Sequence, residues 1–514
     1  MTAEADFNLL LVRVLLSALA LCLLVAGQYL RKSGRGQTLR RSRTVALGLV
    51  AFLAFASAYN FFIWRHQSGI HKHDVYNYYM GSKYFPELGY FGLYECSVSA
   101  LAVDSPGTPP GIAIRDLRNP LHRTVIDPLL QRERCRRDFT PQRWQQFQAD
   151  VRWFRGIFSE EKWASLWEDQ GYNPSPVWTL IGRPVGSLFP AEASSMRLLG
   201  LLDLVLVLVS LAFIGWAFGL EALCLAALVW AVNPMSRYIW IGDAFLRYPW
   251  LVSSIIGLCL LRKERYLGAG MLLALSSLLR IFPVLLVAGY GLAVLLRWRR
   301  EGALDPGVRK FAIGFGVAAS ALVIVSVPVS GRGPGVYADF TGNIVPWSQI
   351  TAWNSVGLRP LLSFSSRAPG AELVGFPVVV TPSSVQKLKD QNFASRRPYY
   401  LAGVCLLLLL VWRGVRDASD WEAAAMGFAL MLVLTQMPSY YSSCMVVPCL
   451  LATRRPRIGI GLLIAMGGMC LASLYFYEDR LEFVAASVIL LLVSLYTLLE
   501  MQLPAPAKVD RDAT

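Results

Sequence analysis

The chain has 514 residues, of which 55% are hydrophobic and only 16% are charged. A soluble protein of this length carries about 25% charged residues, so the composition excludes an ordinary soluble enzyme and indicates a polytopic membrane protein. The formal net charge of +15 is also found in nucleic-acid-binding proteins, but no basic helix interleaved with aromatic residues forms such a surface here. Lys and Arg gathered in short cytoplasmic loops explain the charge, and we expect no nucleic-acid partner.

The first segment, residues 1–65, predicts two N-terminal transmembrane helices. Apolar runs at about 9–30 and 44–64 are long enough to cross a bilayer. Between them, residues 31–43 contain six positive charges and no negative one. The positive-inside rule places this stretch in the cytoplasm and the N-terminus outside. The chain that follows the second helix therefore begins on the outer face.

The next segment, residues 66–195, is polar and is predicted to be a large extracytoplasmic loop that carries the catalytic motif. Asp74 stands a few residues beyond the second helix, beside His71, His73, Lys83 and a run of tyrosines. An ionisable group at a membrane rim costs free energy, so such a residue is a functional candidate. The alternative is that Asp74 only caps the following helix, because Asp is a favoured N-cap residue.

The same loop contains large apolar residues at roughly helical spacing: Trp144, Phe147, Val151, Phe154, Phe158, Trp163 and Trp167. We expect interfacial helices that lie in the membrane surface with Trp at headgroup level. The alternative is an amphipathic helix packed on a small domain. Cys96 and Cys135 also lie in this loop, and they can pair if the loop faces an oxidising compartment.

Residues 196–501 predict the transmembrane bundle, with a second outer loop at 331–398. Residues 502–514 are expected to be a disordered cytoplasmic tail. Threading the charged loops by the positive-inside rule gives about thirteen spans with the C-terminus inside. Beyond the two N-terminal helices, these spans are expected at about 197–217, 219–233, 250–261, 266–279, 281–296, 311–330, 399–412, 420–436, 440–452, 457–476 and 481–501.

The two short spans at 266–279 and 281–296 meet at Leu279-Arg280-Ile-Phe-Pro283. A broken helix at membrane depth is tolerated only where it is buried in protein or lines a cavity. Arg280 is then expected to face that cavity from the outer side, which indicates an anion site.

On this topology the unusual polar residues share the outer side. A carboxylate, Asp74, can accept the proton of an acceptor hydroxyl as a general base, and arginines bind phosphate oxygens through a planar fork. Candidates for binding the donor phosphate or the rest of the substrate are Arg280, Arg247, Lys83, Tyr78, Asp243, Asn354, Arg359, Tyr440 and Tyr441. His71 and His73 with Asp74 are weak candidates for a divalent metal, because residues i and i+2 share a face only in an extended strand. No cofactor is otherwise indicated.

The stretch Asp74-x-x-x-Tyr78-Tyr79 through Gly89 to Leu93-Tyr94 resembles the first-loop pattern of glycosyltransferase family 87. These polyprenol-phosphate-mannose-dependent mannosyltransferases belong to the GT-C class of integral-membrane glycosyltransferases. Ala269-Gly-Met, the 279–283 break, Asn354-Ser355 and Pro438-Ser-Tyr-Tyr441 are similar to further motifs of that family.

The resemblance implies a GT-C-like all-α fold with Asp74 as catalytic base and Arg280 at the donor phosphate. It implies transfer of a hexose, mannose in that family, from a polyprenyl-phosphate-sugar donor to a glycan, lipid or protein acceptor. The active site would face the extracytoplasmic side of a bacterial inner (plasma) membrane. One alternative is a transporter or flippase for a lipid or anionic solute, which uses Arg247 and Arg280 without chemistry. Another is a non-catalytic assembly scaffold, in which Asp74 and Arg280 are both dispensable.

Overall fold

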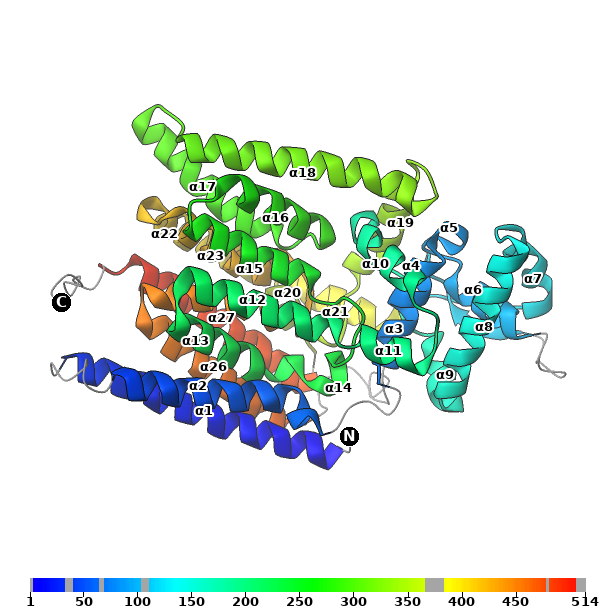
Figure 1. The fold of residues 1–514 in the computed structure, drawn as a ribbon, viewed down its shortest axis with the longest axis horizontal. Coiled ribbons are helices and arrows are strands. Elements are labelled where there is room, and N and C mark those ends of the chain that lie inside the picture. The colour runs from blue at the N-terminus through cyan, green and yellow to red at the C-terminus, as the bar shows by residue number, and fades with distance from the viewer. Residues whose placement is uncertain are drawn as a thin grey trace.

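The computed structural model describes residues 3–32, 40–63, 69–102, 111–365, 383–477 and 480–504, which are mostly helical. The helices form a long bundle, and residues 69–188 form a helical domain at one end of it (Figure 1). Residues 505–514 of the tail expected at 502–514, together with His66 and the middle of the expected second outer loop, lie outside the described residues.

The bundle is an integral membrane unit. Among the described residues, seven helical segments are long and apolar enough to span a bilayer. They are Glu4–Leu30, Arg41–Ala58, Ala193–Phe218, Pro306–Ser330, Arg397–Asp417, Pro456–Tyr475 and Arg480–Gln502. Leu220–Val232, Pro249–Arg262 and Tyr266–Leu279 are apolar but shorter. A straight span needs about 20 residues, so the expected count of thirteen stays a prediction.

The helices of the bundle are α1 (Ala3–Lys32), α2 (Arg40–Ala58), α11 (Ala193–Leu199), α12 (Leu202–Phe218), α13 (Leu220–Val232), α14 (Tyr238–Ile241), α15 (Pro249–Arg262), α16 (Tyr266–Leu279), α17 (Val284–Glu301), α18 (Pro306–Ser330), α19 (Val336–Gln349), α20 (Leu358–Ser363), α21 (Ser383–Ser395), α22 (Arg397–Gly414), α23 (Asp420–Met426), α24 (Phe428–Leu434), α25 (Val446–Leu450), α26 (Pro456–Tyr475) and α27 (Arg480–Gln502). Strands β3 (Ser355–Val356) and β4 (Met437–Pro438) pair antiparallel within it.

The break predicted around Pro283 is confirmed, because α16 ends at Leu279 and α17 begins at Val284. The helix expected at 420–436 is also interrupted. It divides into α23 and α24 at Gly427, where an added Cβ would lie 2.1 Å from the carbonyl oxygen of Leu285 on α17. Because α17 approaches so closely, position 427 requires glycine, and the helix is interrupted there.

The N-terminal helix α1 is joined to the bundle by a buried charge network. Arg237 donates to both carboxylate oxygens of Glu482 on α27, at 2.9 and 3.0 Å. The same guanidinium lies 3.7 Å from the carboxylate of Asp6 on α1. Buried charges are stable only when they are paired, so this network fixes where α1 packs.

The domain outside the bundle consists of α3 (Lys72–Val75), a π-helical turn (Tyr76–Met80), α4 (Gly81–Lys83), α5 (Phe85–Leu88), α6 (Leu93–Leu101), α7 (Pro128–Arg137), α8 (Pro141–Ile157), α9 (Glu160–Leu166) and α10 (Pro176–Leu188). Strands β1 (Ile112–Arg115) and β2 (Arg123–Ile126) form a hairpin at its edge.

The apolar face of α8 and α9 packs inside this domain. The seven residues from Trp144 to Trp167 that predicted interfacial helices are all buried, and Tyr76 meets Phe154 edge-on at 5.1 Å between ring centroids. The structure therefore supports the alternative reading, a helix packed on a small domain. A buried aromatic face is not available to the membrane surface.

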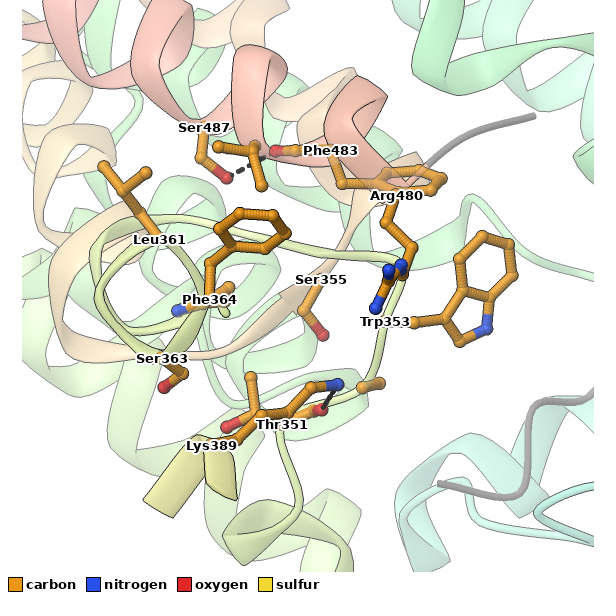
Figure 2. A pocket seen from close by; sticks show the side chains of 13 residues that line it. Thr351, Trp353, Ser355, Leu361, Ser363, Phe364, Lys389, Arg480, Phe483 and Ser487 are labelled. Carbon is orange, nitrogen blue, oxygen red and sulfur yellow. Dashed lines mark hydrogen bonds between the residues drawn. The ribbon is translucent and has the colours of Figure 1, made fainter. Parts of the chain in front are cut away.

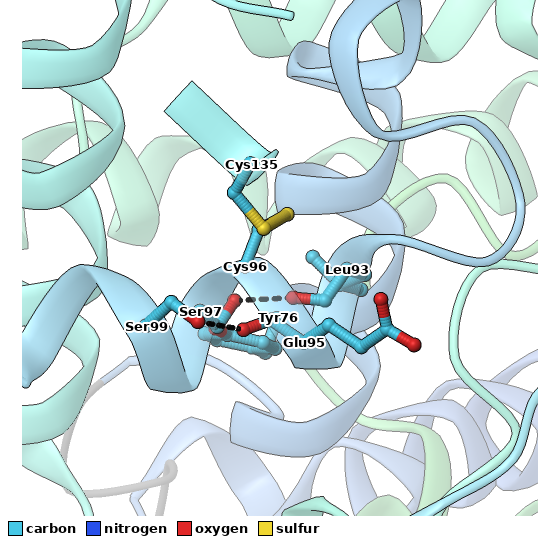
Figure 3. Close-up of a disulfide and its surroundings, with 7 residues drawn as sticks. All are labelled: Tyr76, Leu93, Glu95, Cys96, Ser97, Ser99 and Cys135. Carbon is cyan, nitrogen blue, oxygen red and sulfur yellow. Dashed lines mark hydrogen bonds between the residues drawn. A yellow bond between two sulfur atoms is a disulfide. The ribbon is translucent and has the colours of Figure 1, made fainter. Parts of the chain in front are cut away.

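Cys96 on α6 and Cys135 on α7 form a disulfide with a Cα–Cα distance of 5.5 Å (Figure 3). One residue along α6, the Ser97 hydroxyl accepts a hydrogen bond of 2.6 Å from Tyr76. The disulfide and this bond hold α6 against α7 on one side and against the π-helical turn on the other. A disulfide agrees with an oxidising, extracytoplasmic location.

Candidate functional site

Asp74 lies where the domain meets the bundle and is paired with Arg247. One carboxylate oxygen accepts a hydrogen bond from Nη2 of Arg247, and the other accepts from the backbone N–H of Phe245 at 3.1 Å. Asp74 does not cap α3, because His71 is the N-cap residue and its Nδ1 accepts from the Asp74 backbone N–H at 3.3 Å. The carboxylate is thereby left to face the loop between α14 and α15.

That loop is held by a second carboxylate, Asp203 on α12. Its two oxygens accept hydrogen bonds from the backbone N–H groups of Arg247 at 2.9 Å and Tyr248 at 3.0 Å. Leu246 has a φ of 52°, a left-handed backbone conformation that residues other than glycine rarely adopt. Asp203 therefore stabilises a strained loop and directs the Arg247 side chain toward Asp74.

Arg247 retains binding capacity after these contacts. Its guanidinium lies over the ring of Tyr440 at 4.4 Å from the centroid. Its Nε is buried and has no hydrogen-bond partner among the described residues. A guanidinium has five N–H donors in a fixed plane, so this side chain can bind Asp74 through Nη2 and donate a further hydrogen bond from Nε to an anionic oxygen.

Arg280 lies at the break between α16 and α17 and is surrounded by tyrosines. Its Nη2 donates to the hydroxyl of Tyr78 at 3.0 Å, and its guanidinium is 5.6 Å from the ring centroid of Tyr441. The Tyr78 hydroxyl in turn donates to Oδ1 of Asn173 at 3.0 Å. Within the described part of the chain, Arg280 forms no ion pair with a carboxylate. The site therefore holds a cation whose charge is not neutralised by a direct partner.

The protonation states of these groups follow from their surroundings. Burial by itself lowers the pKa of Arg247, but the Asp74 carboxylate outweighs it and the pKa lies above its ordinary value. Burial also opposes the charge of Arg280, and the neighbouring Tyr441 and Tyr78 raise its pKa above the usual range. Burial raises the pKa of Tyr78 to about 12. At neutral pH both guanidiniums are charged and Tyr78 is a neutral hydroxyl.

Lys83, predicted as a donor-binding residue, has a different environment. It is 1% exposed, and its Nζ lies 2.8 Å from the carboxylate of Asp150 on α8 and donates to the Tyr79 hydroxyl at 2.7 Å. Burial lowers the pKa of this ammonium, and Asp150 opposes that effect. These contacts lie inside the domain and away from Arg247 and Arg280.

The two histidines point in different directions. His71 caps α3, whereas His73 Nε2 lies 3.4 Å from the Ser165 hydroxyl and its ring meets Phe158 edge-on. Burial lowers the pKa of His73 to about 4. In the described residues no group of three His, Cys, Asp or Glu side chains is gathered as a metal site. A divalent metal at His71 and His73 has no geometric support.

Three further predicted residues make other contacts. Asp243 accepts a hydrogen bond from the Tyr238 hydroxyl. The Arg359 guanidinium donates to the carbonyl of Gln349 at 3.2 Å. Asn354 contributes its backbone carbonyl, which accepts from Ser439 N–H at 2.7 Å. That bond extends the β3–β4 pairing and positions the adjacent Tyr440 and Tyr441.

Six of the ten predicted residues are thus brought together: Asp74, Tyr78, Arg247, Arg280, Tyr440 and Tyr441. Sequence reasoning missed Asp203, Asn173 and Asp169. Burial raises the pKa of Asp169 to about 6, and its Oδ2 accepts from Asn77 at 2.7 Å. Asp203 stood out only as a charge near a helix end, and neither Asn173 nor Asp169 has a distinguishing sequence signal.

Comparison with known proteins identifies no relative, because no family model, curated protein or solved structure matches the chain. The site is therefore interpreted from its own geometry.

Proposed function

We propose that this protein is a membrane glycosyltransferase that moves a hexose from a polyprenyl-phosphate-sugar donor to a hydroxyl of an extracytoplasmic acceptor. The observation that carries the proposal is the ion pair of Asp74 with Arg247. Tyr440 and Tyr441 connect this pair to Arg280, a second guanidinium that has no carboxylate partner among the described residues. A carboxylate suits a general base, and unneutralised arginines suit a phosphate leaving group. Mannose as the sugar and a bacterial inner membrane as the location rest on the resemblance to glycosyltransferase family 87.

The proposed reaction is a direct displacement at the anomeric carbon. The acceptor hydroxyl gives its proton to Asp74 while its oxygen bonds to the anomeric carbon. The bond between that carbon and the donor phosphate oxygen breaks, and its electron pair stays on the phosphate. Arg280 and the Nε of Arg247 stabilise the charge that develops there. No redox partner or metal is needed to balance this step.

The tyrosines have supporting roles in this proposal. Tyr78 stays protonated at neutral pH because its pKa is about 12, so it donates hydrogen bonds rather than adding negative charge. Tyr440 covers the face of Arg247 and limits its hydration. Tyr441 does the same for Arg280. Guanidiniums shielded from water bind a phosphate more strongly than exposed ones.

The test is transfer of labelled mannose from polyprenyl-phosphate-mannose in membranes that contain wild type, Asp74→Asn or Asp339→Asn. The matched control, Asp339, is a half-exposed carboxylate paired with Arg332 at 3.7 Å in the second segment expected on the outer side, 331–398. We expect transfer by wild type and by Asp339→Asn, and its loss in Asp74→Asn. Normal transfer by Asp74→Asn would refute the role of the base.

A transporter would use the same arginines without chemistry. Transporters place ionisable residues near the bilayer midplane on several helices, whereas Arg237 and Glu482 lie at the first turns of α14 and α27. Those two side chains bind each other directly, which favours a structural role. If no labelled sugar is transferred from any lipid-linked donor but the donor crosses the membrane, the transporter reading replaces the enzyme.

A further inference from the structure

The loop between α9 and α10, residues 167–175, connects the domain to the helix break that carries Arg280. Ser175 at the end of this loop caps α10, and its Oγ donates to the carbonyl of Leu278 on α16 at 2.6 Å. Leu278 stands two positions before Arg280. The loop therefore touches the backbone of the break directly, next to a cation that has no carboxylate partner among the described residues.

Asn173 in the same loop is joined to the Arg280 side chain through Tyr78. Nη2 of Arg280 donates to the Tyr78 hydroxyl at 3.0 Å, and that hydroxyl donates to Oδ1 of Asn173 at 3.0 Å. Only this direction is possible, because a guanidinium has donors and no acceptor. Nδ2 of Asn173 in turn donates to Oε1 of Gln170 at 3.1 Å. The single proton of Tyr78 is thus committed to Asn173, so Tyr78 acts on Arg280 and not on a bound phosphate.

A second set of hydrogen bonds fixes the loop itself, and its direction is also determined. The backbone N–H of Gly171 donates to the Tyr94 hydroxyl at 2.9 Å, so Tyr94 gives its own proton to Oδ1 of Asn77 at 3.1 Å. Nδ2 of Asn77 then donates to Oδ2 of Asp169 at 2.7 Å. Oδ1 of Asp169 accepts from the backbone N–H of Gln170, also at 2.7 Å. These bonds use both oxygens of the carboxylate and fix the backbone of the loop.

The local sequence explains why the loop has this form. Gly171 has a φ of 64°, and a Cβ added there would lie 2.8 Å from the side chain of Leu117, so the turn requires glycine. Asn77 and Tyr78, which bind the loop at two points, are neighbours on the π-helical turn that begins two residues after Asp74. Such turns are rare and are frequently found at functional sites. One short element thus carries both contacts to the loop beside the proposed base.

We propose that Asn173 is a positioning residue for the donor: through the Tyr78 hydroxyl it holds the Arg280 guanidinium in the orientation that binds the donor phosphate. A side chain that is already held loses less conformational freedom when it binds a ligand, so the ligand is bound more tightly. The ligand class is the phosphate ester of a prenyl chain. The identity of the donor rests on the proposed function, whereas phosphate binding that depends on Asn173 is measured without any transfer of sugar.

The binding test uses purified full-length protein in detergent, titrated with farnesyl phosphate and measured by isothermal titration calorimetry. We expect Asn173→Ala and Tyr78→Phe each to weaken binding about tenfold, the effect of losing one hydrogen bond to a charged group. We expect the double variant to bind no more weakly than Tyr78→Phe, because Asn173 acts through the hydroxyl that Phe lacks. An unchanged affinity in Asn173→Ala, or additive losses in the double variant, would overturn the proposal.

The matched control is Ser487→Ala on α27. The Ser487 hydroxyl donates to the carbonyl of Phe483 at 2.7 Å (Figure 2) and accepts from the backbone N–H of Gly357 at 3.2 Å. Like the Asn173 amide it makes one hydrogen bond in each direction, but with residues outside the chain of hydrogen bonds that ends at Arg280. We expect Ser487→Ala to bind farnesyl phosphate with the wild-type affinity. An equal loss in this variant would count against a specific role of Asn173.

Asn173→Asp separates positioning from packing, because the two roles predict opposite results. Asp has nearly the same shape as Asn and can still accept from Tyr78, so a packing role predicts a smaller loss than in Asn173→Ala. Under the proposed role the loss is larger. A carboxylate separated from Arg280 by two hydrogen bonds of 3.0 Å each attracts the guanidinium and repels the phosphate. Tighter binding by Asn173→Asp than by Asn173→Ala would refute the proposal, and if Asn173→Ala does not fold, wild-type affinity in Asn173→Asp would do so.

The kinetic test separates this inference from the proposed function. In a transferring preparation we expect Asn173→Ala to raise the KM for the donor about tenfold and to leave the KM for the acceptor unchanged. An unchanged donor KM, or equal rises in both, would reject the positioning role and leave the glycosyltransferase standing. Farnesyl phosphate binding that depends on Asn173 and Tyr78, in a protein that transfers no sugar from any lipid-linked donor, would instead retain the positioning role and reject the glycosyltransferase.

Discussion

Replacing Asp74 by Asn has two consequences that must be measured separately. The substitution removes the proposed base, for which we expect a loss of about 10²–10⁴-fold in transfer. It also leaves Arg247, whose side chain is 12% exposed, without its negative partner. Removing one member of a buried ion pair costs about 3–5 kcal/mol. Because Asn keeps an oxygen that can accept from Phe245 N–H, we expect a destabilisation near the lower end, about 3 kcal/mol.

The double variant Asp74→Asn/Arg247→Gln resolves these effects. Both charges are then absent, so we expect a free energy of unfolding within about 1 kcal/mol of wild type, since neutral replacement of a whole pair is tolerated. Transfer should not return. The assays are denaturant unfolding in detergent, followed by intrinsic fluorescence, and labelled-sugar transfer at equal amounts of folded protein.

Two results would refute this reasoning. Transfer restored in the double variant would mean that Asp74→Asn is inactive only because an uncompensated guanidinium disturbs the site. Unchanged stability in the single variant would mean that Arg247 is not held by Asp74, and the geometry on which the proposed mechanism depends would be wrong.

Three further predictions concern the domain outside the bundle. Lys83→Met should lower the free energy of unfolding of this domain by about 3–5 kcal/mol, and the double variant Lys83→Met/Asp150→Leu should recover most of that stability. Denaturant unfolding measures both, and an unchanged stability of Lys83→Met would contradict the buried pair. Because burial lowers the pKa of His73 from 6.5 to about 4, the unfolded chain gains this proton first as the pH falls. The stabilisation by neutral His73 is therefore complete above pH 6.5, and the free energy of unfolding should fall by about 2 kcal/mol by pH 5. His73→Gln should remove this pH dependence. Replacing Cys96 and Cys135 by Ser opens a link over 39 residues and should cost about 4 kcal/mol relative to wild type in oxidising buffer. Reducing buffer opens the same link in wild type, so an equally large difference between the two proteins there would count against the bond.

The sequence was informative where a local rule decides the structure. Pro283 ends the first of two short helices at the predicted place, because proline lacks the N–H that a continuous helix requires. The expected helix at 440–452 was wrong in form: only Val446–Leu450 is α-helical, and tighter 3₁₀ turns flank it. Those turns follow the hydrogen bond from Ser439 to Asn354, a contact between segments 85 positions apart that no local pattern contains.

The site itself required tertiary information for the same reason. Asp74 and Arg247 are 173 positions apart, and Arg280 and Tyr78 are 202 apart. Composition and topology placed these residues on one side of the membrane, but their contacts depend on Asp203, which holds the loop through backbone N–H groups. A residue that acts on backbone leaves no side-chain motif to recognise.

Lys83 and Arg280 show why charge and position in the sequence do not distinguish a structural cation from a binding one. Both donate to a tyrosine hydroxyl, at 2.7 and 3.0 Å. Lys83 also has the carboxylate of Asp150 at 2.8 Å, so its charge is neutralised within the protein. Arg280 has only tyrosines as direct neighbours in the described chain, and its positive charge is left for a ligand. The distinguishing feature is whether a carboxylate lies next to the cation. Asp150 on α8 lies next to Lys83 on α4, whereas Arg280, at the break before α17, lies next to tyrosines.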